Sequence, residues 1–413
     1  MNRFFAVGSS IFALSIALLA ACVGDEPRVT GGEPGGGSSG TSGASGTNDG
    51  GGTSGQPACA GGLTLCADIC VDTQGSGTQC GACGHSCGGG QCSGGLCQPF
   101  PAANGFTAVH AIAASPSGII ISADNDVSLC ANPSGCSAAT LKTIRAGVSQ
   151  LNDVTVAGTD VYFDGNVGNS EIVYRCPIAG CPGTGPTIVE NITNDGIGRV
   201  VAGPNDVLWT RYSDFGPYSR RCVLPGCASN VDVRLKGAVD YSVNPAREQS
   251  VPSKVVSVGA VSTLWATGSL YNDPLKQLRA CPLASACAVP VEIDTGAAGV
   301  SALTYFDGKH YGASGASGGG GSVVFSLSDA APGAGARALL VSDAAGIADV
   351  AVDASGIYWV NAVTGKVLHC AKLTGCSGSG ETLATGQTGA IRIRLDAKFV
   401  YWMTTTSVMK VAK

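Results

Sequence analysis

Cysteine is the residue type with the most capacity for chemistry in this chain, which has 19 cysteines but only four histidines. Pairs with four or five residues between them recur, as in VYRCPIAGCPGTG (173–185). Such a pair could bind a metal, exchange electrons or form a disulfide on a turn. A metal site would draw histidines from other elements, and a redox pair would read C-x-x-C. The spacing therefore favours disulfides, each contributing roughly 2 kcal/mol by closing a short loop.

Ten of the cysteines form five pairs of this kind. Facing Cα atoms across an antiparallel hairpin lie about 4.5–5.5 Å apart, a separation that a disulfide accepts. We expect each cysteine to be joined to its near neighbour: Cys130/Cys136, Cys176/Cys181, Cys222/Cys227, Cys281/Cys287 and Cys370/Cys376.

Eight more cysteines lie close together between residues 58 and 97: Cys59, Cys66, Cys70, Cys80, Cys83, Cys87, Cys92 and Cys97. This segment has almost no large apolar residue, so it needs covalent links to fold. A zinc knuckle built on Cys80, Cys83 and Cys87 is the alternative. Eight cysteines allow about a hundred pairings, so the connectivity stays open. The spacing resembles the small module of stigma-specific proteins, also common in myxobacterial lipoproteins, and the resemblance implies recognition rather than catalysis.

Residues 1–21 combine Arg3 with an apolar run and small residues at its end, a pattern typical of a secretory signal peptide. A retained membrane helix is the competing interpretation. The following residues, Leu19-Ala20-Ala21-Cys22, resemble the lipobox of bacterial lipoproteins, which implies that Cys22 becomes the acylated N-terminus. Several acyl chains would anchor the protein stably. Val23 after Cys22, by resemblance to enterobacterial sorting, favours the outer membrane, facing the periplasm or the cell surface.

Residues 22–57 are rich in glycine and serine and predict a flexible tether that reaches about 30 Å. A phosphate-binding glycine loop is excluded because no Gly-Lys-Ser/Thr occurs. The net charge of −5, without basic clusters, argues against nucleic acid as a partner. We assign no cofactor, metal or catalytic residue, and we expect a monomer.

Residues 98–413 contain seven copies of one pattern, in which an alternating strand, a turn and an aromatic strand follow one another, as in DVAVDASGIYWVN (349–361). Two further strands flank each cysteine pair. Four strands repeated seven times predict an all-β fold, a seven-bladed β-propeller after the cysteine-rich module and the flexible linker. The last copy stops after three strands, and QPFPAANG (98–105) would supply the fourth. Tandem β-sandwiches are the alternative.

The aromatic strands and hairpin disulfides resemble NHL-like propellers of exported bacterial proteins, whereas WD40 signatures are absent. Some similar propellers are lyases or metal-dependent lactonases with polar groups in the central channel. The corresponding positions here are Ala111, Asp153, Arg199, Val255, Ala302, Asp349 and Arg392. We expect ion pairs between neighbouring blades, Asp153 with Arg199 and Asp349 with Arg392. The arginines would repel a divalent metal.

Long loops around the third and fourth blades carry aromatic and arginine side chains, which often anchor recognition. The candidate ligand-binding residues are Tyr212, Phe215, Tyr218, Tyr241, Tyr271, Arg211, Arg220 and Arg247. The alternative is that these rings only pack the loops onto the blades. The sequence thus favours a lipid-anchored binding or scaffold protein for an unknown protein or glycan. A propeller enzyme of the lyase or lactonase type, acting on a small extracellular molecule, is the second hypothesis.

Overall fold

The computed structural model describes the chain from residue 59 onward, with gaps. The described ranges are 59–193, 196–212, 218–225, 227, 230–233, 239–240, 247–248, 251–268, 277–284, 291–293, 299–315, 321–333, 337–344, 346–376, 378 and 380–413. At 196, 211–212, 218, 230–233, 239–240, 247–248, 251–254, 267–268 and 277 this description covers the backbone alone. The predicted signal peptide, Cys22 and the tether lie outside these ranges. Within them no helix is long and apolar enough to span a membrane.

The cysteine-rich module consists of two short hairpins: β1 (Thr64–Cys66) with β2 (Ile69–Val71), and β3 (Cys92–Ser93) with β4 (Leu96–Cys97). Ala67 and Asp68, the two residues of the first turn, both have positive φ, the conformation of a two-residue hairpin loop. Four disulfides hold the module: Cys59–Cys70, Cys66–Cys83, Cys80–Cys92 and Cys87–Cys97.

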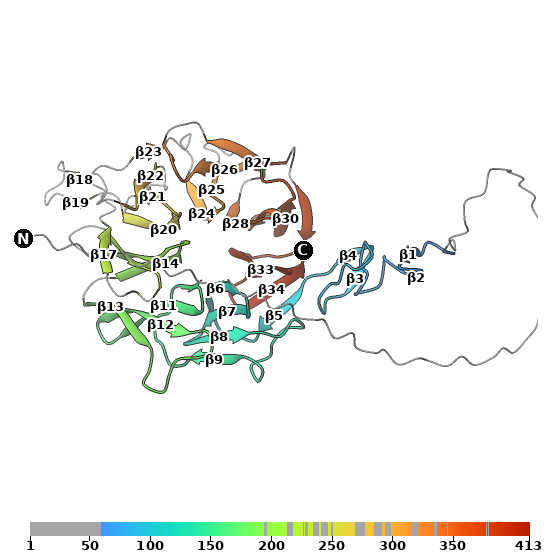
Figure 1. The fold of residues 1–413 in the computed structure, drawn as a ribbon, viewed down its shortest axis with the longest axis horizontal. Helices are drawn as coiled ribbons and strands as arrows, with labels where there is room; N and C mark the ends of the chain where they lie inside the picture. The colour runs from blue at the N-terminus through green and yellow to red at the C-terminus, as the bar shows by residue number, and fades with distance from the viewer. Residues whose placement is uncertain are drawn as a thin grey trace, which may run out of the picture. The chain divides into compact units, whose positions relative to one another are not determined.

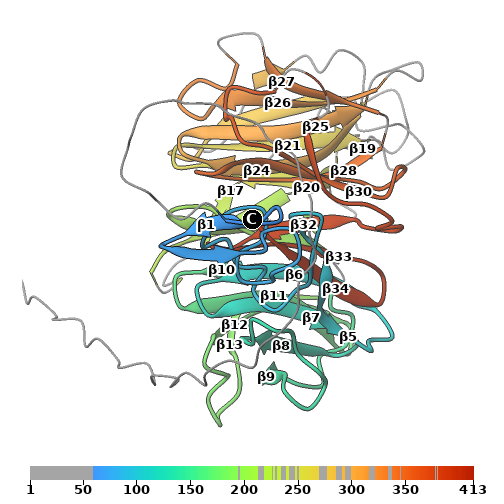
Figure 2. The same cartoon turned by 90° about the vertical axis from the view of Figure 1, so that its right-hand side faces the viewer.

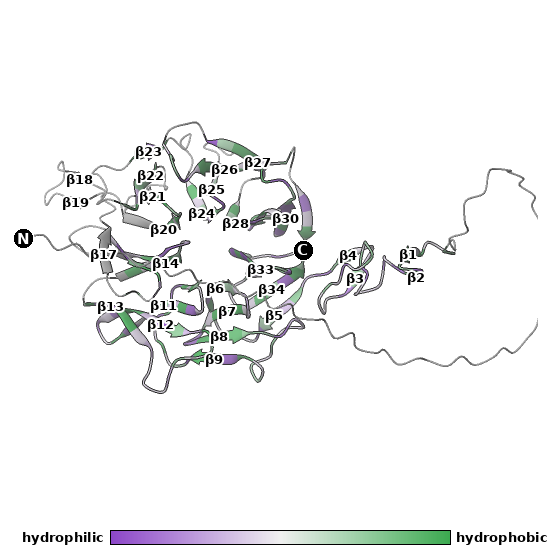
Figure 3. Ribbon diagram, viewed as in Figure 1, coloured by the Kyte–Doolittle hydropathy of each residue, from purple (hydrophilic) through white to green (hydrophobic). Residues whose placement is uncertain are grey.

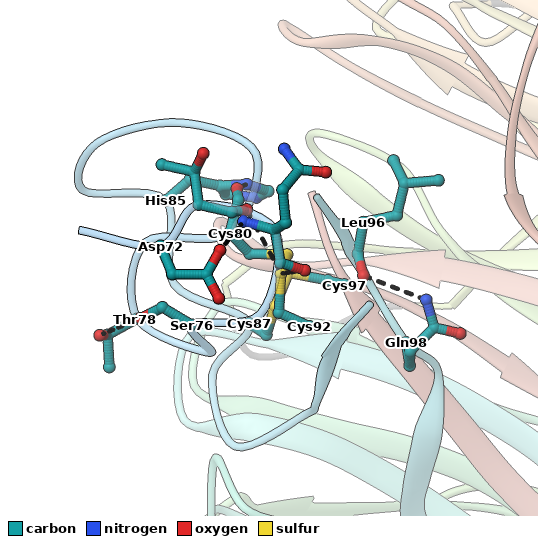
Figure 4. The surroundings of a disulfide bond; sticks show 12 residues. Asp72, Ser76, Thr78, Cys80, His85, Cys87, Cys92, Leu96, Cys97 and Gln98 are labelled. Atoms are coloured by element: carbon teal, nitrogen blue, oxygen red, sulfur yellow. Dashed lines mark hydrogen bonds between the residues drawn. A yellow bond between two sulfur atoms is a disulfide. The ribbon is translucent and has the colours of Figure 1, made fainter. Parts of the chain in front are cut away.

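Two of these disulfides lie side by side in the module (Figure 4). The sulfur atoms of Cys80, Cys87 and Cys97 are within 4.8 Å of one another, a spacing that could suit a metal. All three sulfurs are already bonded in disulfides, and Cys83 is bonded to Cys66. The zinc-knuckle alternative is therefore wrong for this structure, because the thiolates it needs are consumed.

After the module, the described chain forms seven antiparallel four-stranded sheets, arranged as blades around a centre (Figure 1). Blade one is β6 (Val109–Ser115), β7 (Gly118–Ala123), β8 (Asp126–Cys130) and β9 (Lys142–Arg145). Blade two is β10 (Val154–Ala157), β11 (Asp160–Val167), β12 (Ser170–Pro177) and β13 (Thr187–Thr193). Blade three is β14 (Gly196–Ala202), β15 (Asp206–Tyr212), β16 (Tyr218–Val223) and β17 (Asn230–Val233).

A small hairpin, β18 (Val239–Asp240) and β19 (Arg247–Glu248), separates blades three and four. Blade four is β20 (Val251–Val258), β21 (Ser262–Gly268), β22 (Gln277–Pro282) and β23 (Val291–Ile293). Blade five is β24 (Val300–Phe306), β25 (Lys309–Gly315), β26 (Ser322–Ser328) and β27 (Ala338–Asp343). Blade six is β28 (Ile347–Asp353), β29 (Gly356–Asn361), β30 (Lys366–Cys370) and β31 (Glu381–Ala384).

Blade seven closes the ring with strands from both ends of the domain. It contains β32 (Arg392–Leu395), β33 (Phe399–Met403), β34 (Ser407–Ala412) and β5 (Phe100–Asn104). Strand β5 pairs antiparallel with β34, so Val408 faces Ala103. The predicted seven-bladed propeller, with residues 98–105 supplying the last strand, is confirmed. In blade one, both views place β6, β7, β8 and β9 successively farther from the centre (Figures 1 and 2).

The core lies between the blades and repeats with them, and the blade strands are largely hydrophobic (Figure 3). The same position of the second strand holds a buried tryptophan in four blades: Trp209, Trp265, Trp359 and Trp402. Rings of this size bury a large apolar area and dominate core energetics. In blade five the position is Gly312, and the ring of Phe325 fills the space that a side chain there would occupy.

In several blades a disulfide joins the end of the third strand to the loop that leads into the fourth strand. The described bonds are Cys130–Cys136, Cys176–Cys181, Cys222–Cys227 and Cys370–Cys376. Cys281 is also disulfide-bonded, and Cys287 lies outside the described ranges. Blade five has no cysteines. At that place Asp329 accepts hydrogen bonds from the backbone N–H groups of Ala260, Val261 and Ser262 in blade four.

Candidate functional site

The central channel gathers the charged residues of the innermost strands. Six of these strands, β10, β14, β20, β24, β28 and β32, line a cavity of about 380 Å³. A second cavity of about 180 Å³ is lined by residues from the starts of five of them. Arg199, Leu303 and Arg394 border both cavities. The guanidinium groups therefore lie in a layer that separates two polar spaces.

Asp153 is the centre of this layer, and both of its carboxylate oxygens are engaged. Its Oδ1 accepts from Arg392 Nη1 at 2.7 Å and from the backbone of Val154. Its Oδ2 accepts from the backbone N–H of Val200 and lies 3.4 Å from Arg199 Nε. Burial alone would raise the pKa of Asp153, but Arg199 and Arg392 hold it below its ordinary value. Asp153 is thus a buried, ionised anchor.

The second carboxylate pairs differently from the sequence-based expectation. Asp349 accepts from Arg394 Nη1 at 2.8 Å, while Arg392 reaches Asp153 instead. The expected pair of Asp349 with Arg392 is not formed. Arg394 lies two residues after Arg392, so both side chains leave the same face of β32. The pattern Arg-x-Arg was the signal that could have identified Arg394.

The arginines outnumber the carboxylates in this layer by three to two. Burial lowers the pKa of Arg199 to about 10, which keeps the guanidinium protonated at neutral pH. Among the described residues, its buried Nε has no hydrogen-bond partner. The Nε atom lies 3.4 Å from Asp153 Oδ2, which is close enough for an ion pair but does not give the geometry of a hydrogen bond. The layer therefore carries an excess positive charge and an unused donor.

Asp164 lies behind Asp153 in blade two and was not identified from the sequence. It accepts hydrogen bonds from the backbone of Asn152 and Asp153 and from the Asn152 side chain. Burial raises the pKa of Asp164 to about 7, although these donated hydrogen bonds act in the opposite direction. Because its pKa is about 7, Asp164 is only partly ionised at neutral pH. It therefore offsets the three guanidinium charges only in part.

A second polar cluster lies between blades four and five. His310 Nδ1 is 2.9 Å from Ser257 Oγ, and His310 Nε2 is 3.0 Å from both Asp329 Oδ1 and Ser262 Oγ. All four side chains are buried. Asp329 also accepts three backbone N–H groups, so the cluster ties the two blades together in the place where other blades have a disulfide. Burial lowers the pKa of His310, against the opposing effect of Asp329.

The candidate ligand-binding residues lie partly in strands and partly outside the described residues. Phe215, Tyr241 and Tyr271 lie outside the described residues. Arg211 and Tyr212 end β15, Tyr218 begins β16 and Arg247 lies in β19, all with backbone description only. Arg211, Tyr212 and Tyr218 are paired strand positions, so they belong to the blade rather than to a loop. Arg220 Nη1 contacts both oxygens of Glu190 in blade two at 2.7 Å.

Comparison with known proteins identifies no family for this chain. No family model and no curated protein matches the chain. The WD40 β-propeller domain of Doa1 is 12% identical, with a TM-score of 0.49 over 76% of this chain and 97% of that one. The protein lmo1340 from Listeria monocytogenes EGD-e is 10% identical, with a TM-score of 0.45 over 72% and 88%. The chain from a nidogen/laminin complex is 15% identical, with a TM-score of 0.39 over 56% and 82%.

Proposed function

We propose that the protein is an exported lipoprotein of the bacterial envelope that uses its β-propeller to recognise a protein or a glycan. The disulfides of the module and of the blade hairpins carry this proposal. Such bonds form and persist in oxidising compartments and are rare in the cytosol. They support the interpretation of residues 1–21 as a signal peptide and of Cys22 as the lipidated residue.

The anchor is tested by replacing Cys22 with serine. Lipid attachment holds the protein at the membrane in this proposal, so the Cys22→Ser variant is expected in the soluble fraction. Fractionation followed by a carbonate wash measures this. A variant that stays membrane-bound after the wash contradicts the lipoprotein assignment. A parent protein found in the cytosol with free thiols contradicts export itself.

The recognition surface is proposed at the strand ends and connecting segments of blades three and four. Tyrosine and arginine offer large contact area together with directed hydrogen bonds. A triple substitution of Tyr212, Phe215 and Tyr218 by alanine is expected to abolish binding of the partner found by an envelope-extract pulldown. The melting temperature should stay nearly unchanged. A variant that binds like the parent, or that unfolds, shows that these rings are structural.

A propeller enzyme acting on a small extracellular ester or lactone remains the second candidate, and one observation favours it. Ser257, His310 and Asp329 form a continuous serine–histidine–acid chain, and Ser257 borders the larger channel cavity. Burial of the serine side chain argues against substrate access. Turnover of p-nitrophenyl acetate or a simple lactone by the parent, lost in Ser257→Ala, would establish the activity. Equal rates for the two proteins would reject it.

A further inference from the structure

In the charged layer of the channel every carboxylate oxygen of Asp153 and Asp349 accepts a hydrogen bond, whereas the guanidinium groups keep N–H donors that are not used. Asp153 and Asp349 accept backbone N–H groups as well as guanidinium groups. Each guanidinium carries more N–H donors than these carboxylates can take up. Among the described residues, Arg199 forms its ion pair with Asp153, and its buried Nε has no hydrogen-bond partner. The layer is therefore incomplete with respect to acceptors.

Adjacent empty space makes those donors usable. Arg199 and Arg394 border a cavity of about 380 Å³, which is in the size range of small-molecule sites. Arg392 borders the smaller space on the other side of the layer. Guanidinium groups match the geometry of carboxylate and phosphate oxygens and bind them through paired N–H donors. Three arginines against two aspartates, with Asp164 offsetting the difference only in part, leave an excess of positive charge that favours an anion.

We infer that the propeller channel is a binding site for a small molecule bearing an oxyanion, a carboxylate or a phosphate, held by Arg199 and Arg394. The group completes the hydrogen bonding of the arginine layer, and the rest of the molecule lies in the larger cavity. Acidic monosaccharides and phosphorylated small molecules share this chemistry. The inference uses none of the candidate ligand-binding residues of blades three and four, and it depends on neither export nor lipid anchoring.

Isothermal titration of the purified protein, with its disulfides intact, tests the inference. The probes are sodium glucuronate, inorganic phosphate and uncharged glucose, each in low-salt buffer. Either anion is expected to bind more tightly than glucose, with an affinity that falls as sodium chloride is added. Tighter binding of glucuronate would indicate an acidic sugar as the ligand, and tighter binding of phosphate would indicate a phosphorylated molecule. No binding of either anion at millimolar concentration overturns the site.

Three variants locate the binding. Arg199→Gln removes the unused donor and is expected to weaken binding by at least about tenfold, the effect of one charge-assisted hydrogen bond. Asp349→Asn removes the carboxylate that competes for Arg394 and is expected to tighten binding severalfold. Arg175→Gln is the matched control, because Arg175 pairs with Asp160 on the outer part of blade two and is absent from the channel lining.

Folding is checked by circular dichroism and melting for each variant. If Arg199→Gln does not fold, the Asp349→Asn variant decides, since its expected change is a gain of affinity that misfolding cannot produce. Equal affinities in the parent and Asp349→Asn, or a loss in Arg175→Gln as large as in Arg199→Gln, overturn the inference. If the triple variant of Tyr212, Phe215 and Tyr218 still binds its partner, that result contradicts the proposed function and leaves the anion site unaffected.

Discussion

Arg392 in blade seven donates a hydrogen bond of 2.7 Å to Asp153 in blade two, although 239 residues separate them in the sequence. Blade one lies between these two blades in the ring. The contact therefore crosses the channel and joins two blades that are not neighbours in the ring. It adds to the strand pairing of β5 with β34, which closes the ring at its periphery. Closure is thus held at both the inner and outer parts of the propeller.

Removing the carboxylate at the centre of this layer should destabilise the propeller. Asp153→Asn leaves three guanidinium groups facing one remaining carboxylate, Asp349, in a buried setting. Breaking a buried charge pair costs about 3–5 kcal/mol of unfolding free energy. Urea unfolding measures the loss. Asp160→Asn, which breaks the more exposed pair with Arg175, should cost less than about 1 kcal/mol. Equal losses in the two variants would show that the central position of Asp153 is unimportant.

Lys410 of the closing blade provides a test in the alkaline range. Its ammonium group is buried among the rings of Phe100, Phe399 and Tyr401 and donates to the carbonyl groups of Asn132 and Pro133. Burial lowers the pKa of Lys410 to about 8, against the opposing charge of Asp396. A folded pKa below the unfolded value means that the folded state releases its proton first, so this group adds stability as pH rises from 8 to 10.5.

The variant that isolates this effect is Lys410→Met, which keeps the length of the side chain without the charge. The difference in unfolding free energy, parent minus variant, is expected to stay flat below pH 8 and to rise by up to about 1.4 kcal/mol per pH unit above it. Urea titrations at several pH values measure this difference. A flat difference up to pH 10.5 contradicts a lowered pKa for Lys410.

The fold could be read from the sequence because its signals are local and repeated. Strand alternation, the aromatic doublets and the cysteine pairs recur in most blades, and the missing last strand pointed to residues 98–105. The channel was harder to predict, because its contacts depend on where the ring closes. Inner-strand positions identified Asp153, Arg199, Asp349 and Arg392, yet the partners of Asp349 and Arg392 were assigned to the wrong residues. Neighbour order along the chain carries no information about a contact across the channel.

The polar cluster around His310 could not be identified from the sequence pattern. A single histidine such as His310 does not reveal that Ser257, from the previous blade, and Asp329 converge on its two ring nitrogens. The carboxylate of Asp329 stands where other blades have cysteines, so the absence of a disulfide in blade five was the available clue. The function of that position, joining blade five to blade four, became visible only with the backbone contacts of Ala260 and Val261.

The His310 cluster should make stability depend on pH in the mildly acidic range. Because burial lowers its pKa, the folded state binds a proton less readily than the unfolded chain, whose histidine titrates near 6.5. The groups that face the ring are Ser257, Ser262, Asp329 and Tyr305. Stability is expected to fall as pH drops below 6.5, by up to about 1.4 kcal/mol per pH unit.

The His310→Gln variant lacks this titration and serves as the comparison. The parent should lose stability relative to the variant between about pH 7 and pH 5.5, a range above the titration of ordinary carboxyl groups. The lowered pKa of Asp329 acts below that range and leaves the comparison there unaffected. Parallel curves for the two proteins would show that His310 does not titrate differently in the folded state.

Gly312 of blade five offers the sharpest test of the core. A Cβ atom at this position would overlap the ring of Phe325 and approach a methyl group of Leu303 at 2.9 Å. Gly312→Ala is expected to lower the free energy of unfolding by about 1–3 kcal/mol, since overpacking forces side chains or backbone to shift. Gly315→Ala in the same strand is the matched control, because a Cβ there meets no atom within 4 Å. The double variant Gly312→Ala with Phe325→Leu should recover part of the loss, as the smaller side chain vacates the space. Equal stability of the two single variants in urea would contradict the assignment of Phe325 as the ring that replaces the tryptophan of the other blades.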